Sequence, residues 1–105
     1  MDAKDFIQKT VSENPIVLFM KGTAQFPQCG FSGRVVQILK AYPIEYETFN
    51  VLSDPAVRQG IKDYANWPTI PQLYVKGEFV DGADILTEMF ENGELQGLLK
   101  QAQVA

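Results

Sequence analysis

The sequence of 105 residues contains no histidine and a single cysteine, Cys29. Without histidine, the chain has no Cys–His or Ser–His nucleophile pair and no metal site with a histidine ligand. A lone cysteine cannot form an internal disulfide, which favours a reducing compartment and predicts a cytoplasmic location. One thiolate also cannot complete a four-coordinate zinc or iron site, so a soft metal would need ligands from a second chain or a small thiol.

Basic clusters and long apolar runs are also missing from the chain. The net charge is −4, so neither nucleic acid nor an anionic membrane surface is an expected partner. No apolar run approaches the roughly 20 residues that span a bilayer. The acidic start, Met1–Asp5, lacks the apolar region of a secretory signal. A hydrophobic content of 46% predicts instead one globular domain with its own core.

Hydrophobic periodicity predicts alternating helices and strands. Ser53, Asp54 and Pro55 supply a capping residue, a first-turn acid and a proline that needs no N–H donor, so a helix should start there and run to about Tyr64. The other expected helices cover residues 3–13, 30–40, 85–91 and 94–101, and the expected strands cover 16–20, 45–51, 72–75 and 78–80. A helical crossover makes the first two strands parallel, and a tight turn makes the last two antiparallel. The result is an α/β fold: a mixed four-stranded sheet flanked by helices on both faces.

The stretch Pro27–Arg34 places Cys29 between the apolar strand 16–20 and the helix 30–40. A thiol at the first turn of a helix lies where free N–H groups and the helix dipole stabilise negative charge. Such a thiol ionises readily and becomes a nucleophile or a metal ligand. The alternative is a small buried apolar side chain. The inner face of this helix should carry Phe31, Val35, Ile38 and Leu39, and Gly33 suggests a close neighbour.

Four separate motifs carry a resemblance to a known family: Lys21, Cys29-Gly30-Phe31-Ser32, Trp67-Pro68-Thr69-Ile70-Pro71 and Gly82-Ala83-Asp84. With the element order and the six-residue loop Thr23–Gln28, they resemble the monothiol glutaredoxins of the CGFS type, in their bacterial single-domain form. The resemblance spans about residues 5–100 and implies a thioredoxin-like fold with one glutaredoxin domain over residues 1–105.

The resemblance implies that the chain binds glutathione and, as a homodimer, one [2Fe-2S] cluster. Cys29 from each chain and the thiol of each of two glutathiones would then be the metal ligands, in line with the ligand shortage noted above. The implied role is cluster storage and transfer to apo iron–sulfur proteins, with BolA-like proteins as further partners. The alternative is an oxidoreductase in which Cys29 removes glutathione from protein mixed disulfides. Ser32 replaces a second cysteine, so oxidoreductase turnover should be weak.

The resemblance also assigns roles to three basic residues. Lys21 would stabilise the Cys29 thiolate and pair with a glutathione carboxylate; otherwise it is an ordinary surface lysine. Arg58 would hold the glycine carboxylate of glutathione, and the alternative is a solvated charge on an exposed helix face. Arg34 is a weaker candidate that faces solvent or a dimer partner.

The remaining implied glutathione contacts lie late in the chain. Pro71 should follow a cis peptide bond, leaving the backbone of Ile70 to pair with the cysteinyl part of glutathione. Backbone N–H groups of Ala83 and Asp84 would hold the γ-glutamyl carboxylate, while the Asp84 side chain takes the ammonium or acts as a helix N-cap. Trp67 and Pro68 would lie near the groove, or serve as plain core and turn. Asp81 departs from the family pattern of two glycines and places a negative charge near the expected carboxylate.

Overall fold

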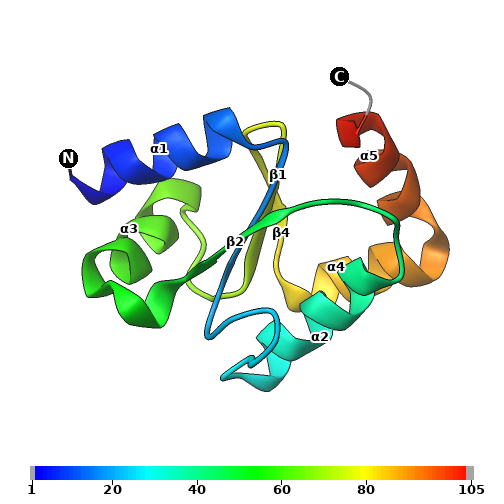
Figure 1. Cartoon of the computed structure of the whole chain (residues 1–105), viewed down its shortest axis with the longest axis horizontal. Helices are drawn as coiled ribbons and strands as arrows, with labels where there is room; N and C mark the ends of the chain where they lie inside the picture. Colours follow the sequence, from blue (N-terminus) through cyan, green and yellow to red (C-terminus); the bar gives the residue numbers. More distant parts are fainter. Residues whose placement is uncertain (1, 104–105) are drawn as a thin grey trace.

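A four-stranded mixed sheet separates two layers of helices in the computed structural model, which describes residues 2–103 (Figure 1). Helices α1 and α3 cover one face, and α2, α4 and α5 cover the other (Figure 1). The architecture confirms the predicted thioredoxin-like fold. The elements in chain order are α1 (Ala3–Glu13), β1 (Ile16–Met20), α2 (Gly30–Lys40), β2 (Glu47–Asn50), the 3-10 helix η1 (Val51–Ser53), α3 (Pro55–Ala65), β3 (Gln72–Val75), β4 (Glu78–Asp81), α4 (Ala83–Asn92) and α5 (Glu94–Gln103).

The strand order in the sheet is β2-β1-β3-β4. β1 runs parallel to β2, and β3 runs antiparallel to β4, as the connections predicted. The structure adds that β1 runs antiparallel to β3. Every residue of β1 is buried, which explains its unbroken apolar sequence. No helix within residues 2–103 is long and apolar enough to cross a membrane.

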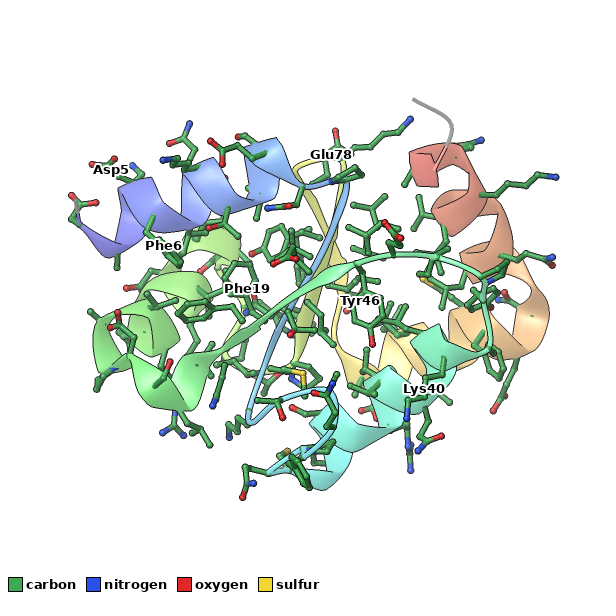
Figure 2. All side chains as sticks on the ribbon, in the orientation of Figure 1. Asp5, Phe6, Phe19, Lys40, Tyr46 and Glu78 are labelled. Carbon is green, nitrogen blue, oxygen red and sulfur yellow. The ribbon has the colours of Figure 1, made fainter. Side chains whose placement is uncertain are left out.

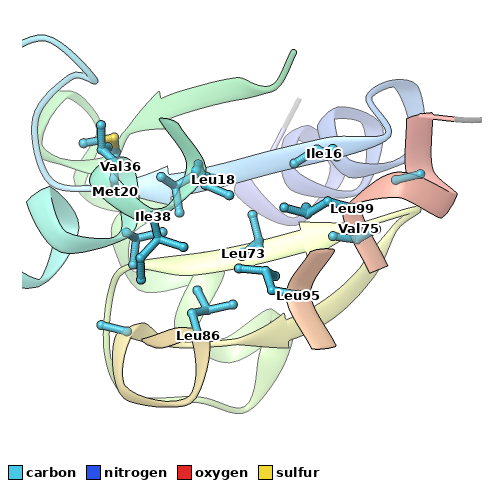
Figure 3. Packing of buried hydrophobic residues seen from close by; sticks show 14 residues of the cluster. Ile16, Leu18, Met20, Val36, Ile38, Leu73, Val75, Leu86, Leu95 and Leu99 are labelled. Atoms are coloured by element: carbon cyan, nitrogen blue, oxygen red, sulfur yellow. The ribbon is translucent and has the colours of Figure 1, made fainter. Parts of the chain in front are cut away.

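Side chains of β1 alternate between two core clusters, one on each face of the sheet. Leu18 packs with Leu95 and Leu99 on the face covered by α2, α4 and α5 (Figure 3). Phe19 packs on the opposite face, where Phe6 from α1 lies close by (Figure 2). Each such buried side chain contributes about 1.5–3 kcal/mol, so the sheet is held firmly from both sides.

Local capping explains where the helices begin. The carboxylate of Asp2 accepts a hydrogen bond from the Asp5 N–H at 2.9 Å, which starts α1. Asp54 caps α3 by accepting from Ala56 N–H at 3.0 Å, with Pro55 in the first turn. The prediction that Ser53 is the capping residue was therefore wrong, because Ser53 ends η1.

The predicted bounds of β2 and α4 were also wrong, while β4 and α5 end one and two residues later than predicted. The strand expected over 45–51 is limited to Glu47–Asn50, because its ladder ends opposite Met20, the last residue of β1. The Asn50 side chain then accepts from the Leu52 N–H at 3.0 Å and starts η1. The helix expected over 85–91 begins earlier, at Ala83, because Gly82 is extended and forms its N-cap.

Candidate functional site

Cys29 is the N-cap residue of α2 and is half-buried. The backbone N–H of Ser32 is the largest of the causes that lower the pKa of the Cys29 thiol below its ordinary value of 9.0. Burial opposes this shift, while the N–H of Phe31, the charge of Lys21 and the Ser32 hydroxyl lower the pKa further. The thiol therefore lies at the start of a helix, as predicted, in surroundings that favour the thiolate.

Ser32 connects the end of β1 to the first turn of α2. Its side chain is fully buried, and its Oγ accepts a hydrogen bond from the Lys21 N–H at 3.1 Å. Lys21 directly follows β1, so this bond fixes the point at which the chain leaves the sheet. Ser32 thus positions both the thiol and the backbone of the lysine that acts on it.

Backbone hydrogen bonds hold the loop between Lys21 and Cys29 in a defined shape. Thr23 and Phe26 exchange two hydrogen bonds, of 3.2 and 3.1 Å, and the Gln28 N–H donates to Lys21 O at 2.9 Å. Gly22 has a φ of +92°, and a Cβ there would lie 2.6 Å from the backbone of Phe26 and Gln28, so only glycine fits. Phe26, in this loop three residues before Cys29, is 74% exposed.

A shallow groove of about 120 Å³ lies between the entry to β3 and the start of α4. Thr69, Ile70 and Pro71 form one wall, and Ala83 and Asp84 form the other. Phe31, two residues beyond Cys29, also lines it. The peptide bond between Ile70 and Pro71 is cis, which confirms that prediction. The structure thus brings three of the predicted glutathione residues, Ile70, Ala83 and Asp84, into one groove beside the thiol-bearing helix.

The start of α4 supplies positive polarity to this groove. Ala83 and Asp84 occupy its first turn, where backbone N–H groups lack helical partners. Gly82 is the N-cap, so the alternative that Asp84 caps the helix was wrong. The Asp81 carboxylate accepts from the N–H of Gly82 at 2.9 Å. Its negative charge therefore lies against the helix start.

The remaining predicted residues lie outside the lining of the groove. Arg58 is in the first turn of α3 and Arg34 is on α2, and both are exposed. Trp67 is 38% exposed and packs its ring 5.9 Å from that of Phe79. Within residues 2–103, no group of three or more acidic, histidine or cysteine side chains gathers to hold a metal ion.

Two predictions about α2 were wrong. Phe31 was expected on its inner face, but the ring is 56% exposed, because Ser32 takes the buried position in that turn. Gly33 was expected to allow a close approach, yet a Cβ there would lie 3.6 Å from Pro27, an ordinary contact distance. Phe31 and Phe26 instead leave exposed aromatic surface on both sides of Cys29.

Residues that the sequence did not single out support the site from within. Asn50 accepts from the Gly22 N–H at 2.9 Å and so ties the thiol loop to β2. Gln72 is fully buried and donates to the carbonyl oxygens of Trp67 and Thr69. Only one signal pointed to Gln72, a polar residue opening an otherwise apolar strand.

A larger hollow of about 770 Å³ lies between α1 and α3. Asp2, Lys4 and Asp63 are among its lining residues, and neither Cys29 nor any other residue predicted for the site lines it. Of these two hollows, only the smaller groove next to the start of α2 is lined by residues predicted for the site.

Comparison with known proteins identifies the family to which the chain belongs. The glutaredoxin family model matches residues 16–80. A monothiol glutaredoxin described as uncharacterized and ycf64-like, from Synechocystis sp., is 55% identical over 101 residues, which cover 96% of this chain and 94% of the relative. The chloroplastic monothiol glutaredoxin-S14 of Arabidopsis thaliana is 52% identical over 94% of this chain, which spans only 57% of that relative.

A solved structure shows the same likeness in three dimensions. The solution structure of reduced poplar apo GrxS14 matches with a TM-score of 0.84 and 49% identity, covering 97% of this chain and 94% of that one. The chain belongs to the glutaredoxin family and, within it, to the monothiol glutaredoxins.

Proposed function

We propose that this chain binds glutathione in the groove beside Cys29 and that two chains together hold a [2Fe-2S] cluster for delivery to apo-proteins. The observation that carries the proposal is the setting of Cys29, a half-exposed thiol with a lowered pKa and no second cysteine in the chain. A thiolate without a resolving partner suits metal ligation better than disulfide exchange. The proposed location is the cytoplasm, and BolA-like proteins are proposed as further partners.

The donor set of the chain fits such a cluster only when it is shared. Iron–sulfur clusters take four thiolates, whereas this chain offers one and has no histidine to replace the others. Two copies of Cys29 and the thiols of two glutathiones would complete the set. When bound, the cluster supplies the iron and sulfide that the protein delivers. The exposed rings of Phe26 and Phe31 leave apolar surface beside the thiol for a second chain to cover.

Glutathione carries two carboxylates and one ammonium, and the groove has groups that suit one carboxylate and the ammonium. The first-turn N–H groups of Ala83 and Asp84 suit the γ-glutamyl carboxylate, and the Asp84 side chain suits the ammonium. Ile70 offers its main chain to the cysteinyl part. Lys21 and Arg58, which do not line the groove, would hold the glycine carboxylate, with Arg58 able to form two parallel hydrogen bonds.

The lowered pKa of Cys29 also favours a second function, removal of glutathione from proteins. The Cys29 thiolate would attack the glutathione sulfur of a mixed disulfide, forming a Cys29–glutathione disulfide and releasing the protein thiolate. A second glutathione thiolate would then attack that disulfide, releasing oxidised glutathione and the Cys29 thiolate. This cycle needs one cysteine and uses glutathione as the reductant.

Anaerobic reconstitution with iron and sulfide tests the main proposal. We expect visible absorbance and a dimer on size exclusion only when glutathione is present, and neither in Cys29→Ser. Ser12→Ala is the control, because its hydroxyl is exposed on α1, on the opposite face of the sheet from α2.

A colourless wild type that rapidly reduces a glutathionylated peptide would replace the cluster proposal with the oxidoreductase. A cluster retained without glutathione would contradict the shared ligand set.

A further inference from the structure

The loop that forms one wall of the groove has few hydrogen bonds of its own. It leaves α3 through Asn66, whose backbone is left-handed with a φ of 51°, and it reaches β3 at Gln72. Pro68 and Pro71 lack backbone N–H groups, so they cannot donate to neighbouring segments. Residues 66–69 are exposed. Ile70 is anchored by its buried side chain, so it is the exposed residues before it that depend on contacts from outside the loop.

The side chain of Gln72 makes the fixing contacts. Its Nε2 donates to Trp67 O at 3.2 Å and to Thr69 O at 3.1 Å, which uses both of its hydrogens. The residue is 0% exposed, so no solvent competes for these bonds. One side-chain amide thus fastens two carbonyl groups of the loop to the first residue of β3.

Tyr74 fixes which way the amide of Gln72 points. Its hydroxyl donates to Gln72 Oε1 at 3.0 Å, and a flipped amide would lose this bond and place an oxygen against two carbonyl groups. Tyr74 is 1% exposed, and its ring lies 5.6 Å from those of Phe19 and Phe79. The amide is therefore oriented by a side chain that is itself held by the core.

The same loop also contacts the opposite wall of the groove. A Cβ at Gly82 would lie 3.2 Å from Trp67 Nε1 and 3.5 Å from Pro71 O, so the start of α4 fits closely against the loop. A shift of Trp67 or Thr69 would therefore change the separation between Ile70 and the first turn of α4. The geometry of both walls depends on the loop that Gln72 holds.

We infer that Gln72 is a positioning residue for glutathione binding, acting through Trp67 and Thr69 rather than by touching the ligand. The inference rests on the proposed function, because it assigns glutathione to this groove. It predicts that glutathione affinity depends on the two N–H groups of Gln72, separately from the stability of the fold. The ionisation of Cys29 depends on α2 and Lys21, so it should not respond to Gln72.

The test compares Gln72→Met with Leu99→Ala. Methionine preserves length and volume but donates no hydrogen bond. Leu99 is 1% exposed and does not line the groove, so its truncation destabilises the fold without removing a lining residue. Because Gln72→Met loses two hydrogen bonds to the loop, we expect it to weaken glutathione binding by about tenfold or more in calorimetry. Leu99→Ala should leave the glutathione affinity within about twofold of the wild type.

Tyr74→Phe separates the two parts of the network. It removes the hydroxyl but leaves both N–H groups of Gln72, so its glutathione affinity should lie between those of the wild type and Gln72→Met. The pH midpoint for alkylation of Cys29 should match the wild type in every variant. Equal glutathione affinity in Gln72→Met and the wild type would overturn the inference.

Two further measurements test the hydrogen bonds of Gln72 even if a variant misfolds or glutathione does not bind. In the wild type, NMR should detect couplings across the hydrogen bonds from the Gln72 side-chain amide to the Trp67 and Thr69 carbonyl carbons. Backbone amide exchange at residues 67–73 should be faster in Gln72→Met, or in the shorter Gln72→Asn, than in Leu99→Ala. A wild type that binds no glutathione refutes the proposed function. Missing couplings, or unchanged exchange, refute the role of Gln72.

Discussion

Replacing Ser32 with alanine removes a buried hydroxyl that has two partners. Ser32 Oγ accepts from the Lys21 N–H at 3.1 Å, and the same hydroxyl helps to lower the pKa of the Cys29 thiol. Leaving a buried donor without its acceptor costs about 1–3 kcal/mol. The better helix propensity of alanine offsets about 0.5 kcal/mol of this. We therefore expect Ser32→Ala to lower the free energy of unfolding by about 0.5–2.5 kcal/mol, or roughly 2–20 °C in Tm for a domain of this size.

Ser12→Ala provides a matched control for this substitution. Its hydroxyl also bonds within a helix, to Gln8 O at 2.6 Å, but it is exposed, so its loss should change stability by less than about 0.5 kcal/mol. Urea unfolding of both variants under reducing conditions measures the difference.

The thiol provides a second readout for Ser32→Ala. The pH midpoint for alkylation of Cys29 should rise yet stay below 9.0, because the backbone N–H of Ser32, the largest cause of the lowered pKa, remains. Equal stability of Ser32→Ala and Ser12→Ala, or an unchanged midpoint, would contradict the role of the Ser32 hydroxyl.

Three other substitutions test the electrostatics of the site. Lys21→Gln should raise the pKa of Cys29, as measured by the pH dependence of alkylation. The control Lys40→Gln, in the last turn of α2, should leave this pKa unchanged. Identical pH profiles for the two variants would show that the charge of Lys21 does not act on the thiol. Because folding lowers the pKa of Cys29, the stability that the thiolate contributes should be fully present above pH 9.0 and be lost as pH falls through the lowered pKa. The difference in unfolding free energy between the wild type and Cys29→Ser should therefore shrink as pH falls, and a difference independent of pH would contradict the shift. Asp81→Asn removes a negative charge at the start of α4 but keeps an acceptor for the Gly82 N–H. It should therefore strengthen glutathione binding by about two- to fivefold at low salt. This gain in affinity should decrease at high salt, where the charge is screened. Equal affinities at low salt would show that the Asp81 charge does not reach the ligand.

Hydrophobic periodicity was sufficient to predict the sheet and its helices, because β1 and the inward faces of the helices are defined by burial alone. The position of Cys29 before a helix was also predictable, since it depends only on neighbouring residues. Element ends were less predictable: β2 stops where the partner strand β1 stops, and that limit is set across the sheet rather than within 45–51.

The internal supports of the site could not be read from local patterns. Helical spacing placed Phe31 inward with Val35, but the first turn of α2 turns Ser32 toward Lys21 instead. Gln72 bonds to residues 3 and 5 positions earlier through a side chain, and the period-2 pattern of a strand does not predict such contacts. The pairing of the loop at 69–71 with the start of α4 likewise exists only after folding. These residues were predicted for the site only through the resemblance to a family, because the local sequence pattern does not indicate that they lie together.

Native mass spectrometry of the reconstituted protein is the sharpest test of cluster sharing between two chains, because it counts every ligand of the cluster at once. We expect a species with two chains, two glutathiones, two irons and two sulfides, which is absent for Cys29→Ser. A single chain carrying the cluster, or a dimer that carries it without glutathione, would contradict it.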